Sequence, residues 1–304
     1  MNAVPKLSLN DGHLIPQLGF GVWQIEPKDT AEAVSEALRV GYRHIDTAEG
    51  YGNEKEVGEA IRTYGLDRGD VFVTSKLSRS SREPRHAHER FERTLSDLAF
   101  DYVDLFLLHW PWWPLPRLPR LYAEPFVVTW RTLEEFHRDG RAHSIGVSNF
   151  QIEHLKRLAA ETDTVPAVNQ IEAHPYFTNG AVREYSREHG IAIEAWSPIA
   201  HGKVLGDPTI TQIADRVGKT PAQVVLRWHI QRGDIVLTKS VTPSRMKENF
   251  ELFNFELEPA DMYAITARDR GENGRTGPNP DTPKWKVRGS QLFWTVSRLL
   301  NQNR

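Results

Sequence analysis

Residues 41–58 read Gly41-Tyr-Arg-His-Ile-Asp-Thr-Ala-Glu-Gly-Tyr-Gly-Asn-Glu-Lys-Glu-Val-Gly58 and hold the clearest structural signal in the chain. The pattern predicts a short strand that ends at Asp46, a loop that carries Tyr51, and a helix that opens near Asn53. Parallel α/β folds collect their chemistry just beyond the carboxyl ends of their strands. An acid and a phenol five residues apart at such a position therefore form a candidate site.

Two further polar residues end later apolar runs in the same way. Lys76 closes one run and His109 closes another. Taken alone, Asp46 could cap a loop and Tyr51 could be a packing ring. Lys76 could form a surface ion pair, and His109 could bond to backbone. Their joint position at strand ends predicts that the four converge on one proton-transfer site.

Eight strand-like apolar runs alternate with amphipathic helical patterns along the chain. The strands are expected at Gly19–Trp23, His44–Asp46, Val71–Lys76, Val103–His109, Ser144–Ser148, Ala167–Ile171, Ile191–Trp196 and Ile235–Lys239. The helices are expected at Asp29–Val40, Glu54–Tyr64, Pro84–Leu98, Val128–Asp139, Ile152–Ala160, Ala181–His189 and Pro221–Gln231, with a further start at Thr242-Pro243. This alternation favours a (β/α)8 TIM barrel. A doubly wound sheet is the competitor, but no Gly-x-Gly-x-x-Gly follows the first strand.

The two ends of the chain add to this barrel. Asn10-Asp11-Gly12 separates two short alternating runs and so predicts an N-terminal β-hairpin. No linker or internal repeat divides the chain, so residues 1–304 are expected to form a single domain, with 284–304 as a C-terminal extension. Loops are predicted at Trp110–Phe126 and Gly271–Pro283, and a short helix at Leu292–Leu300.

Composition excludes several classes of function. The chain of 304 residues carries a formal net charge of -2, which argues against a dedicated nucleic-acid binder. It has no cysteine, so disulfides, thiolate metal sites and cysteine nucleophiles are excluded, and no metal site is expected. No apolar run approaches the ~20 residues that span a bilayer. Residues 1–6 lack an apolar signal core, so a cytoplasmic protein is expected, and without an exposed apolar repeat we expect a monomer.

The four strand-end residues suit the protonation of an oxygen atom. A phenol with a pKa of about 10 is a poor acid at neutral pH, and a nearby ammonium lowers that pKa. Lys76 could supply the ammonium to Tyr51, and Asp46 could hold the lysine charged and in place. His109 could then donate a hydrogen bond to a substrate oxygen. Reduction of a carbonyl by hydride needs this arrangement, because negative charge develops on the oxygen.

The resemblance to a known family rests on motifs that follow one another from about residue 5 to residue 283. They are Gly41–Gly58, Thr74–Leu77, Leu108–Pro111, Ile145–Phe150, Val168–Ile171, Ala195–Pro198 and Thr238–Arg245. In these motifs the chain resembles the aldo-keto reductase family. Within it the chain is most similar to the bacterial 2,5-diketo-gluconate reductase-like group, through the Tyr-to-Lys spacing, Ala195-Trp196 and the glycine-rich stretch near Gly271–Arg275.

The resemblance implies an oxidoreductase that binds NADPH in an extended form, without a Rossmann motif. It implies reduction of aldehydes and ketones to alcohols by hydride transfer from the nicotinamide. By family role, Tyr51 is the general acid. Asp46 and Lys76 tune this acid, and His109 orients the carbonyl.

The resemblance also assigns the nicotinamide pocket. Ser148, Asn149 and Gln170 would hold the carboxamide, whose donors and acceptors they can satisfy. Trp196 would stack on the nicotinamide ring. Ser148 and Asn149 are equally compatible with a cap of the helix that follows them, and Trp196 with core packing.

A charged run after the last predicted strand matches the adenosine end of the cofactor. Lys239, Ser240, Thr242 and Arg245 would bind the 2′-phosphate at a helix start, and Glu248 and Asn249 would contact the adenosine. A glycine-containing loop at 197–205 would close over the pyrophosphate. A solvated helix start is the alternative for the charged run. The full expected cofactor set is Gly21, Val22, Trp23, Asp46, Ser148, Asn149, Gln170, Trp196, Ser197, Pro198, Ile199, Gly202, Leu205, Lys239, Ser240, Val241, Thr242, Arg245, Glu248 and Asn249.

An aromatic wall is expected around a small carbonyl substrate. The substrate contacts are assigned to Trp23, Tyr51, His109, Trp110 and Trp112. Packing of a loop on the barrel rim is the alternative for Trp112.

Three departures from the family limit what the resemblance says of the substrate. Ser78-Arg79-Ser80 stands where the family often has tryptophan, so one pocket wall could be replaced. Arg117 and Arg120 could favour anionic substrates or simply keep their loop in water. The tail after Pro283 lies beyond the part that matches.

Two other classes of function stay open. A barrel enzyme without redox chemistry would be a Schiff-base lyase with Lys76 or Lys239 as its nucleophile, or a hydrolase that uses two carboxylates. Such a lysine is kept neutral by burial or nearby cations, and Asp46 opposes this for Lys76. A cofactor-sensing protein would bind NADPH with slow turnover, and the intact set of four strand-end residues argues against it.

Overall fold

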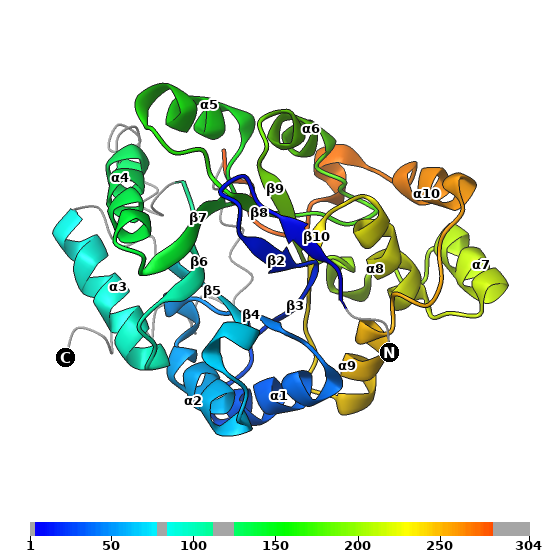
Figure 1. The fold of residues 1–304 in the computed structure, drawn as a ribbon. Coiled ribbons are helices and arrows are strands. Elements are labelled where there is room, and N and C mark those ends of the chain that lie inside the picture. Colours follow the sequence, from blue (N-terminus) through cyan, green and yellow to red (C-terminus); the bar gives the residue numbers. More distant parts are fainter. Residues whose placement is uncertain (1–3, 78–83, 112–124, 282–304) are drawn as a thin grey trace, which may run out of the picture.

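The computed structural model describes residues 4–77, 84–111 and 125–281. Within these ranges eight parallel strands form one closed barrel, in the order β10-β3-β4-β5-β6-β7-β8-β9 (Figure 1). They are β3 (Leu18–Gly21), β4 (His44–Asp46), β5 (Phe72–Leu77), β6 (Val103–Leu108), β7 (Ala142–Ser148), β8 (Val168–Glu172), β9 (Ala192–Trp196) and β10 (Ile235–Thr238). The parallel pairing of β10 with β3 closes the ring. The predicted (β/α)8 barrel is therefore confirmed.

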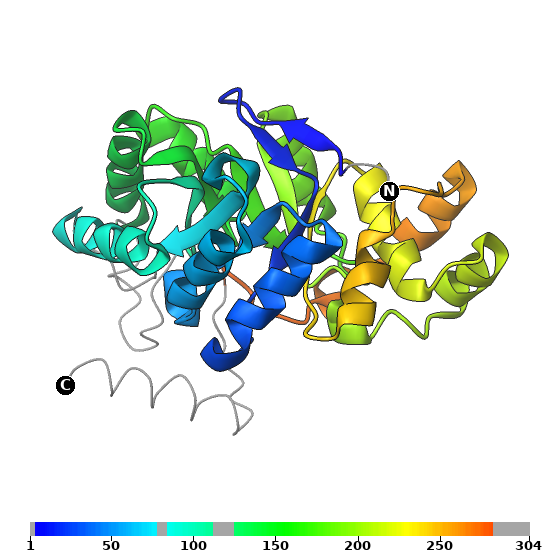
Figure 2. The same cartoon turned by 60° about the horizontal axis from the view of Figure 1, so that its bottom comes forward.

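A β-hairpin of β1 (Lys6–Ser8) and β2 (Leu14–Pro16) lies across one end of the barrel (Figures 1 and 2). Gly12 takes up the φ of 89° in the turn between the two strands. Ile15 is fully buried, in one cluster with Ile235 at the start of β10. The hairpin therefore closes the amino-terminal end of the barrel, and the carboxyl ends of the strands point away from it.

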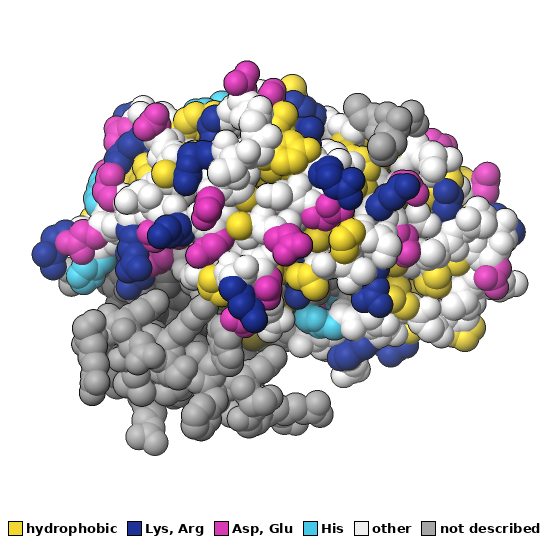
Figure 3. Space-filling view, turned by 90° about the horizontal axis from the view of Figure 1, so that it is seen from below, with side chains coloured by type: hydrophobic (Ala, Val, Ile, Leu, Met, Phe, Trp, Pro, Cys, Tyr) yellow, Lys and Arg dark blue, Asp and Glu magenta, His cyan; other side chains and the backbone are white. Residues whose placement is uncertain are grey.

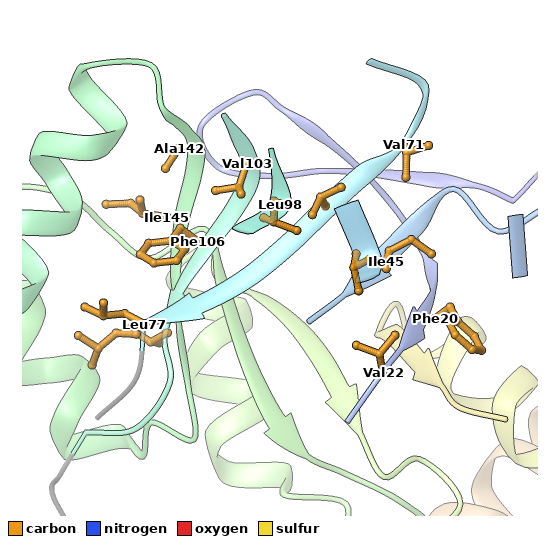
Figure 4. Close-up of a cluster of buried hydrophobic side chains, with 14 of the residues drawn as sticks. Phe20, Val22, Ile45, Val71, Leu77, Leu98, Val103, Phe106, Ala142 and Ile145 are labelled. Carbon is orange, nitrogen blue, oxygen red and sulfur yellow. The ribbon is translucent and has the colours of Figure 1, made fainter. Parts of the chain in front are cut away.

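The surrounding helices bury their apolar faces against the strands. They are α1 (Pro27–Val40), α2 (Glu54–Tyr64), α3 (Pro84–Leu98), α4 (Pro125–Arg138), α5 (Ile152–Glu161), α6 (Gly180–Glu188), α7 (Pro208–Val217), α8 (Pro221–Gln231), α9 (Pro243–Phe250) and α10 (Pro259–Thr266). Figure 4 shows part of this layer, in which Phe106, Ile145 and Leu98 belong to one buried cluster. Helices α7 and α10, which the sequence pattern did not predict, pack with α8 around the buried Trp228.

The predicted strands differ from the observed ones at their ends. β3 stops at Gly21 rather than at Trp23, because the chain turns there and the Ile25 amide bonds to the Val22 carbonyl at 3.0 Å. β6 and β10 stop one residue before His109 and Lys239. The predicted loop over 110–126 is shorter at its far end, since α4 begins at residue 125.

Several predictions lie outside the described residues. They concern Trp112, Arg117, Arg120, the Ser78-Arg79-Ser80 segment, Leu292–Leu300 and the extension over 284–304. In the ranges that are described, no helix combines the length and the apolar character needed to cross a membrane. On the face drawn in Figure 3, acidic and basic side chains are interspersed rather than gathered by sign.

Candidate active site

The barrel brings Asp46, Tyr51 and Lys76 into direct contact. Asp46 ends β4, Tyr51 ends a single 3-10 turn over Glu49–Tyr51, and Lys76 lies within β5. Lys76 Nζ donates to both carboxylate oxygens of Asp46 at 2.7 Å and to the Thr47 carbonyl at 2.9 Å. It also donates to the Tyr51 hydroxyl at 3.2 Å. The predicted chain of acid, ammonium and phenol is thus present as a hydrogen-bonded cluster.

The ammonium of Lys76 is held in its charged form although the side chain is fully buried. Burial alone lowers the pKa of a lysine, but the charge of Asp46 and the hydrogen bonds to Asp46 and Tyr51 outweigh it and raise the pKa of Lys76 above its usual value. Burial acts on the Asp46 carboxyl in the opposite sense and raises its pKa, while Lys76 and Gln170 oppose that rise. An ion pair between Lys76 and Asp46 satisfies both groups.

The effect on Tyr51 differs from the expectation. Burial raises the pKa of the Tyr51 phenol to about 12, and the nearby Lys76 ammonium only opposes that rise. The expected net lowering is therefore wrong for the protein on its own, because burial could not be judged from sequence. The phenol keeps its proton, and the ammonium stands ready to stabilise the phenolate once that proton leaves.

His109 completes the group at the first position after β6. Its ring meets the Tyr51 ring edge to face, with 5.8 Å between centroids and 76° between planes. The Trp110 ring lies 6.4 Å from the His109 ring at 30°. Trp23 lies on the surface, 44% exposed, with its ring 6.5 Å from that of His201. The described members of the predicted substrate set thus lie just after β3, in the 3-10 turn over Glu49–Tyr51 and just after β6. Trp112 is outside the described residues.

The predicted carboxamide residues form a second hydrogen-bonded group. Ser148 Oγ donates to the Gln170 carbonyl at 3.0 Å, and Asn149 Nδ2 donates to Ser148 Oγ at 3.0 Å. Asn149 Nδ2 also donates to the His109 carbonyl at 3.1 Å, which ties this group to the first one. Trp196 Nε1 donates to Asn149 Oδ1 at 3.0 Å.

The helix-cap reading of Ser148 and Asn149 is wrong. The residue that caps α5 is Gln151, which forms a capping box with His154. Asn149 instead takes a left-handed backbone with φ of 66°. Such strain in a non-glycine residue persists only where the surroundings enforce it, and it is frequent at ligand sites.

The loop after β9 shows the same kind of strain. Ser197, Ala200 and His201 have φ of 51°, 49° and 53°, and Gly202 follows with 87°. Pro198 is buried, whereas Ile199 and Leu205 pack against the cluster around Trp228. The predicted pyrophosphate loop is therefore a defined turn anchored by apolar residues. At the end of β3, two strands round the ring from β9, Gly21 and Val22 lie close to Asp46, whose carbonyl accepts from the Val22 amide at 3.0 Å.

The predicted phosphate residues lie at the start of α9. Lys239 is exposed directly after β10, and Arg245 is exposed in the first turn of the helix. Neither makes a hydrogen bond or ion pair with any residue that the structure describes. Two unpaired cations at a helix start fit a phosphate group well.

The rest of that run is more ordinary. Ser240 Oγ accepts from the Thr242 amide at 2.9 Å and so shapes the turn, and Val241 is 61% exposed. Glu248 accepts from the Thr220 hydroxyl at 2.7 Å, which joins α9 to α8, and Asn249 is half-buried. Glu248 therefore has a structural contact of its own beside its predicted place at the adenosine.

Two buried acids in this region were not predicted as site residues. Glu194 of β9 is fully buried and accepts from Gln170 Nε2 at 2.7 Å. Glu172 of β8 accepts from the Thr276 amide and hydroxyl at 2.6 Å each and from the Gly277 amide at 2.9 Å. Burial acts to raise the pKa of Glu172, but these bonds and one from His174 lower it overall. An acid within an apolar strand was the available signal for both.

Comparison with known proteins supports the same family. A sequence model of the Aldo/keto reductase family matches residues 17–270. An aldo-keto reductase of Mycobacterium sp. (strain KMS) is 47% identical over 278 residues, which cover 91% of this chain and 97% of that protein. The methylglyoxal reductase DkgA of Escherichia coli (strain K12) is 42% identical over 278 residues, which cover 90% and 96%.

Solved structures agree with these sequence relatives. The crystal structure of an aldo/keto reductase from Brucella melitensis has a TM-score of 0.82 and 48% identity, covering 88% of this chain and 100% of that chain. A mutant of Gox0644 in complex with NADPH has a TM-score of 0.86 and 43% identity, covering 93% and 100%. The chain therefore belongs to the Aldo/keto reductase family of oxidoreductases, as its motifs predicted.

Proposed function

We propose that this chain reduces small aldehydes and ketones with NADPH and that Tyr51 gives the proton. The observation that carries the proposal is the buried Lys76 ammonium, which donates to Tyr51 at 3.2 Å and to Asp46 at 2.7 Å. Tyr51 keeps its proton at rest, and the ammonium stabilises the phenolate that forms beside the His109 ring once that proton is given. The relatives support the same class of reaction, since one is a methylglyoxal reductase and another was solved with NADPH.

Each residue then has one task. The carbonyl oxygen lies between the Tyr51 hydroxyl and His109 and accepts the tyrosine proton as negative charge develops. Lys76 stabilises the phenolate, and Asp46 keeps the lysine charged and fixed. Tyr51 is only half-buried, so water can return its proton. Bound NADPH would supply the hydride to the carbonyl carbon.

The cofactor would lie along the carboxyl ends of the strands, from β7 round to β10. Ser148, Asn149 and Gln170 offer the amide-binding groups, and Trp196 offers a ring for stacking. Lys239 and Arg245, without partners in the described part of the chain, favour NADPH over NADH because only NADPH carries a 2′-phosphate. The strained loop at 197–205 would cover the pyrophosphate.

Two smaller points belong to the same proposal. The chain acts as a single domain, since the described ranges build one barrel. It acts as a monomer, which light scattering of the purified protein tests directly.

The test of the function is the consumption of NADPH, followed by absorbance, with a panel of carbonyl compounds. The panel holds methylglyoxal, aromatic aldehydes, keto sugars, 2-keto acids and ketosteroids, each repeated with NADH. Turnover that is faster with NADPH is the expected result. Tight NADPH binding without turnover on any member would instead favour the cofactor-sensing function.

A further inference from the structure

A chain of buried polar groups runs beneath the proposed site and includes one acid with no assigned role. Gln170 Nε2 donates to Asp46 Oδ2 at 2.8 Å and to Glu194 Oε2 at 2.7 Å. An amide nitrogen carries two hydrogens, so both are used. Gln170 therefore joins the Asp46 carboxylate to Glu194, which is fully buried within the barrel.

The second oxygen of Glu194 is not satisfied by a hydrogen bond within the described ranges. It lies 3.5 Å from Nε2 of His44, which is fully buried and hydrogen-bonded to the Thr74 hydroxyl at 3.0 Å. Burial lowers the pKa of His44 to about 3, so this imidazole is neutral and one of its nitrogens can accept a hydrogen bond. A carboxylate here would leave a buried charge half-satisfied, which is costly. A carboxylic acid can instead direct its hydroxyl towards the Nε2 lone pair of His44, which it then shares with the Thr74 hydroxyl.

The charges around Glu194 favour the same protonation state. The titratable groups that face it are His44 and Asp46 of β4, Lys76 of β5 and Tyr51 of the turn after β4. The neighbouring β10 and the next strand, β3, carry no titratable side chain. On the other neighbour, β8, Glu172 pairs in register with Trp196 and not with Glu194. Two ionised carboxylates would therefore share the single ammonium of Lys76. Burial first, and then the negative charge of Asp46, raise the pKa of Glu194 to about 8.

We propose that Glu194 is a positioning residue that works as a neutral carboxylic acid, holds Gln170 against Asp46, and slows reduction when it loses its proton. The inference rests on the proposed reductase function. An ionised Glu194 competes for the Gln170 amide and adds negative charge near Tyr51, which makes the phenol a weaker acid. The Lys76 ammonium then interacts with two carboxylates instead of Asp46 alone.

The kinetic test compares the wild type with Glu194→Gln, which keeps the shape and the neutral state. We expect the wild-type kcat for NADPH-dependent reduction to fall above about pH 8 and the Glu194→Gln kcat to stay level there. The matched control is Glu54→Gln. Glu54 is another buried acid, with a pKa raised to about 7 by burial, but it accepts from Ser75 at 2.6 Å outside the proton-transfer cluster. The control is expected to keep the wild-type decline.

A second readout needs neither turnover nor cofactor. Infrared difference spectra of the free protein, titrated from neutral to alkaline pH, should show a protonated carboxyl band that disappears near pH 8. Glu194→Gln should lack this band and Glu54→Gln should keep it. The inference is overturned if kcat has the same alkaline pH dependence in the wild type and in Glu194→Gln. It is also overturned if Glu194→Gln retains the band. Either result leaves the reductase function standing. A protein with no carbonyl turnover defeats the proposed function, and the infrared band still decides the state of Glu194.

Discussion

Two sets of cations at the carboxyl end of the barrel differ in how they are satisfied. Lys76, in the centre, is fully buried and donates to Asp46, Thr47 and Tyr51 within 3.2 Å. Lys239 and Arg245, at the edge, are exposed and have no partner in the described ranges. The partners of Lys76 are supplied by the protein itself, whereas Lys239 and Arg245 have no counter-charge among the described residues. The proposed reacting centre is therefore preorganised by the protein, whereas the two edge cations would be neutralised only by a bound ligand.

The largest effect on rate should come from Tyr51→Phe, which changes a hydrogen-bond partner of the central Lys76. This change removes the proposed proton donor and keeps the ring, so kcat for carbonyl reduction should fall by roughly 10²- to 10⁴-fold. NADPH affinity, measured by fluorescence titration, should stay near the wild-type value. A rate close to that of the wild type would remove Tyr51 from its role as the acid.

The next largest effect should be a lower free energy of unfolding in Lys76→Met. The buried Asp46 carboxylate would lose its ammonium, and breaking a buried pair in this way costs about 3–5 kcal/mol. Urea unfolding measures the change. Adding Asp46→Asn to the same protein should recover part of the loss, because the unpaired charge is then gone. A cost below about 1 kcal/mol would mean that the pair behaves like an exposed one and would erase the contrast.

At the edge, Arg245→Ala should act on binding alone. A charge-assisted hydrogen bond contributes about 1.5–3 kcal/mol, so NADPH affinity should fall by roughly 10- to 100-fold while NADH affinity and stability stay nearly constant. Lys247→Ala is the matched control, since Lys247 is a base on the same helix that faces Glu251 at 3.9 Å. Equal losses for both cofactors in Arg245→Ala would exclude the 2′-phosphate contact.

The smallest expected effect is that of salt, which should weaken NADPH binding at the edge and leave the buried Lys76–Asp46 pair unchanged. Raising ionic strength from about 0.1 M to 1 M shortens the screening length from about 10 Å to 3 Å. NADPH binding in the wild type should weaken, and Arg245→Ala should lose part of this sensitivity. The stability difference between the wild type and Lys76→Met should stay unchanged, because water and ions do not reach the buried pair. A salt-dependent difference there would show that the pair is wetter than the structure indicates.

The contrast also explains what sequence could predict. The cluster of Asp46, Tyr51 and Lys76 could be predicted because all three stand at or just after strand ends, and strand ends follow from runs of apolar residues. The phosphate role of Arg245 stays a prediction. The alternation of strands and helices in the barrel could be predicted from the same apolar runs. α4 begins at Pro125, three residues before its predicted start at Val128. Helix α7 was not predicted from the sequence, although its apolar residues recur at helical spacing, and neither was α10, whose residues show no such period.

Other features depend on ring closure and could not be predicted. Glu194 gains its role from His44, Asp46 and Gln170, which come together only when β10 closes on β3. The pKa direction of Tyr51 depends on burial by other segments. Sequence reasoning took Ser148 as a possible helix cap because its true partner, the Gln170 carbonyl, belongs to the next strand.

The contacts of Glu172 also constrain how the chain matures during its synthesis. Its acceptor oxygens belong to the middle of the chain, but Thr276 and Gly277 follow 104 and 105 residues later. Because translation proceeds at about 5–20 residues per second, the acid emerges seconds before these donors. Until residues 276 and 277 leave the ribosome, the Glu172 carboxylate of a nascent barrel has only its bond from His174. A chain cut short before residue 276 would therefore have to bury this acid without three of the four hydrogen bonds that its carboxylate accepts.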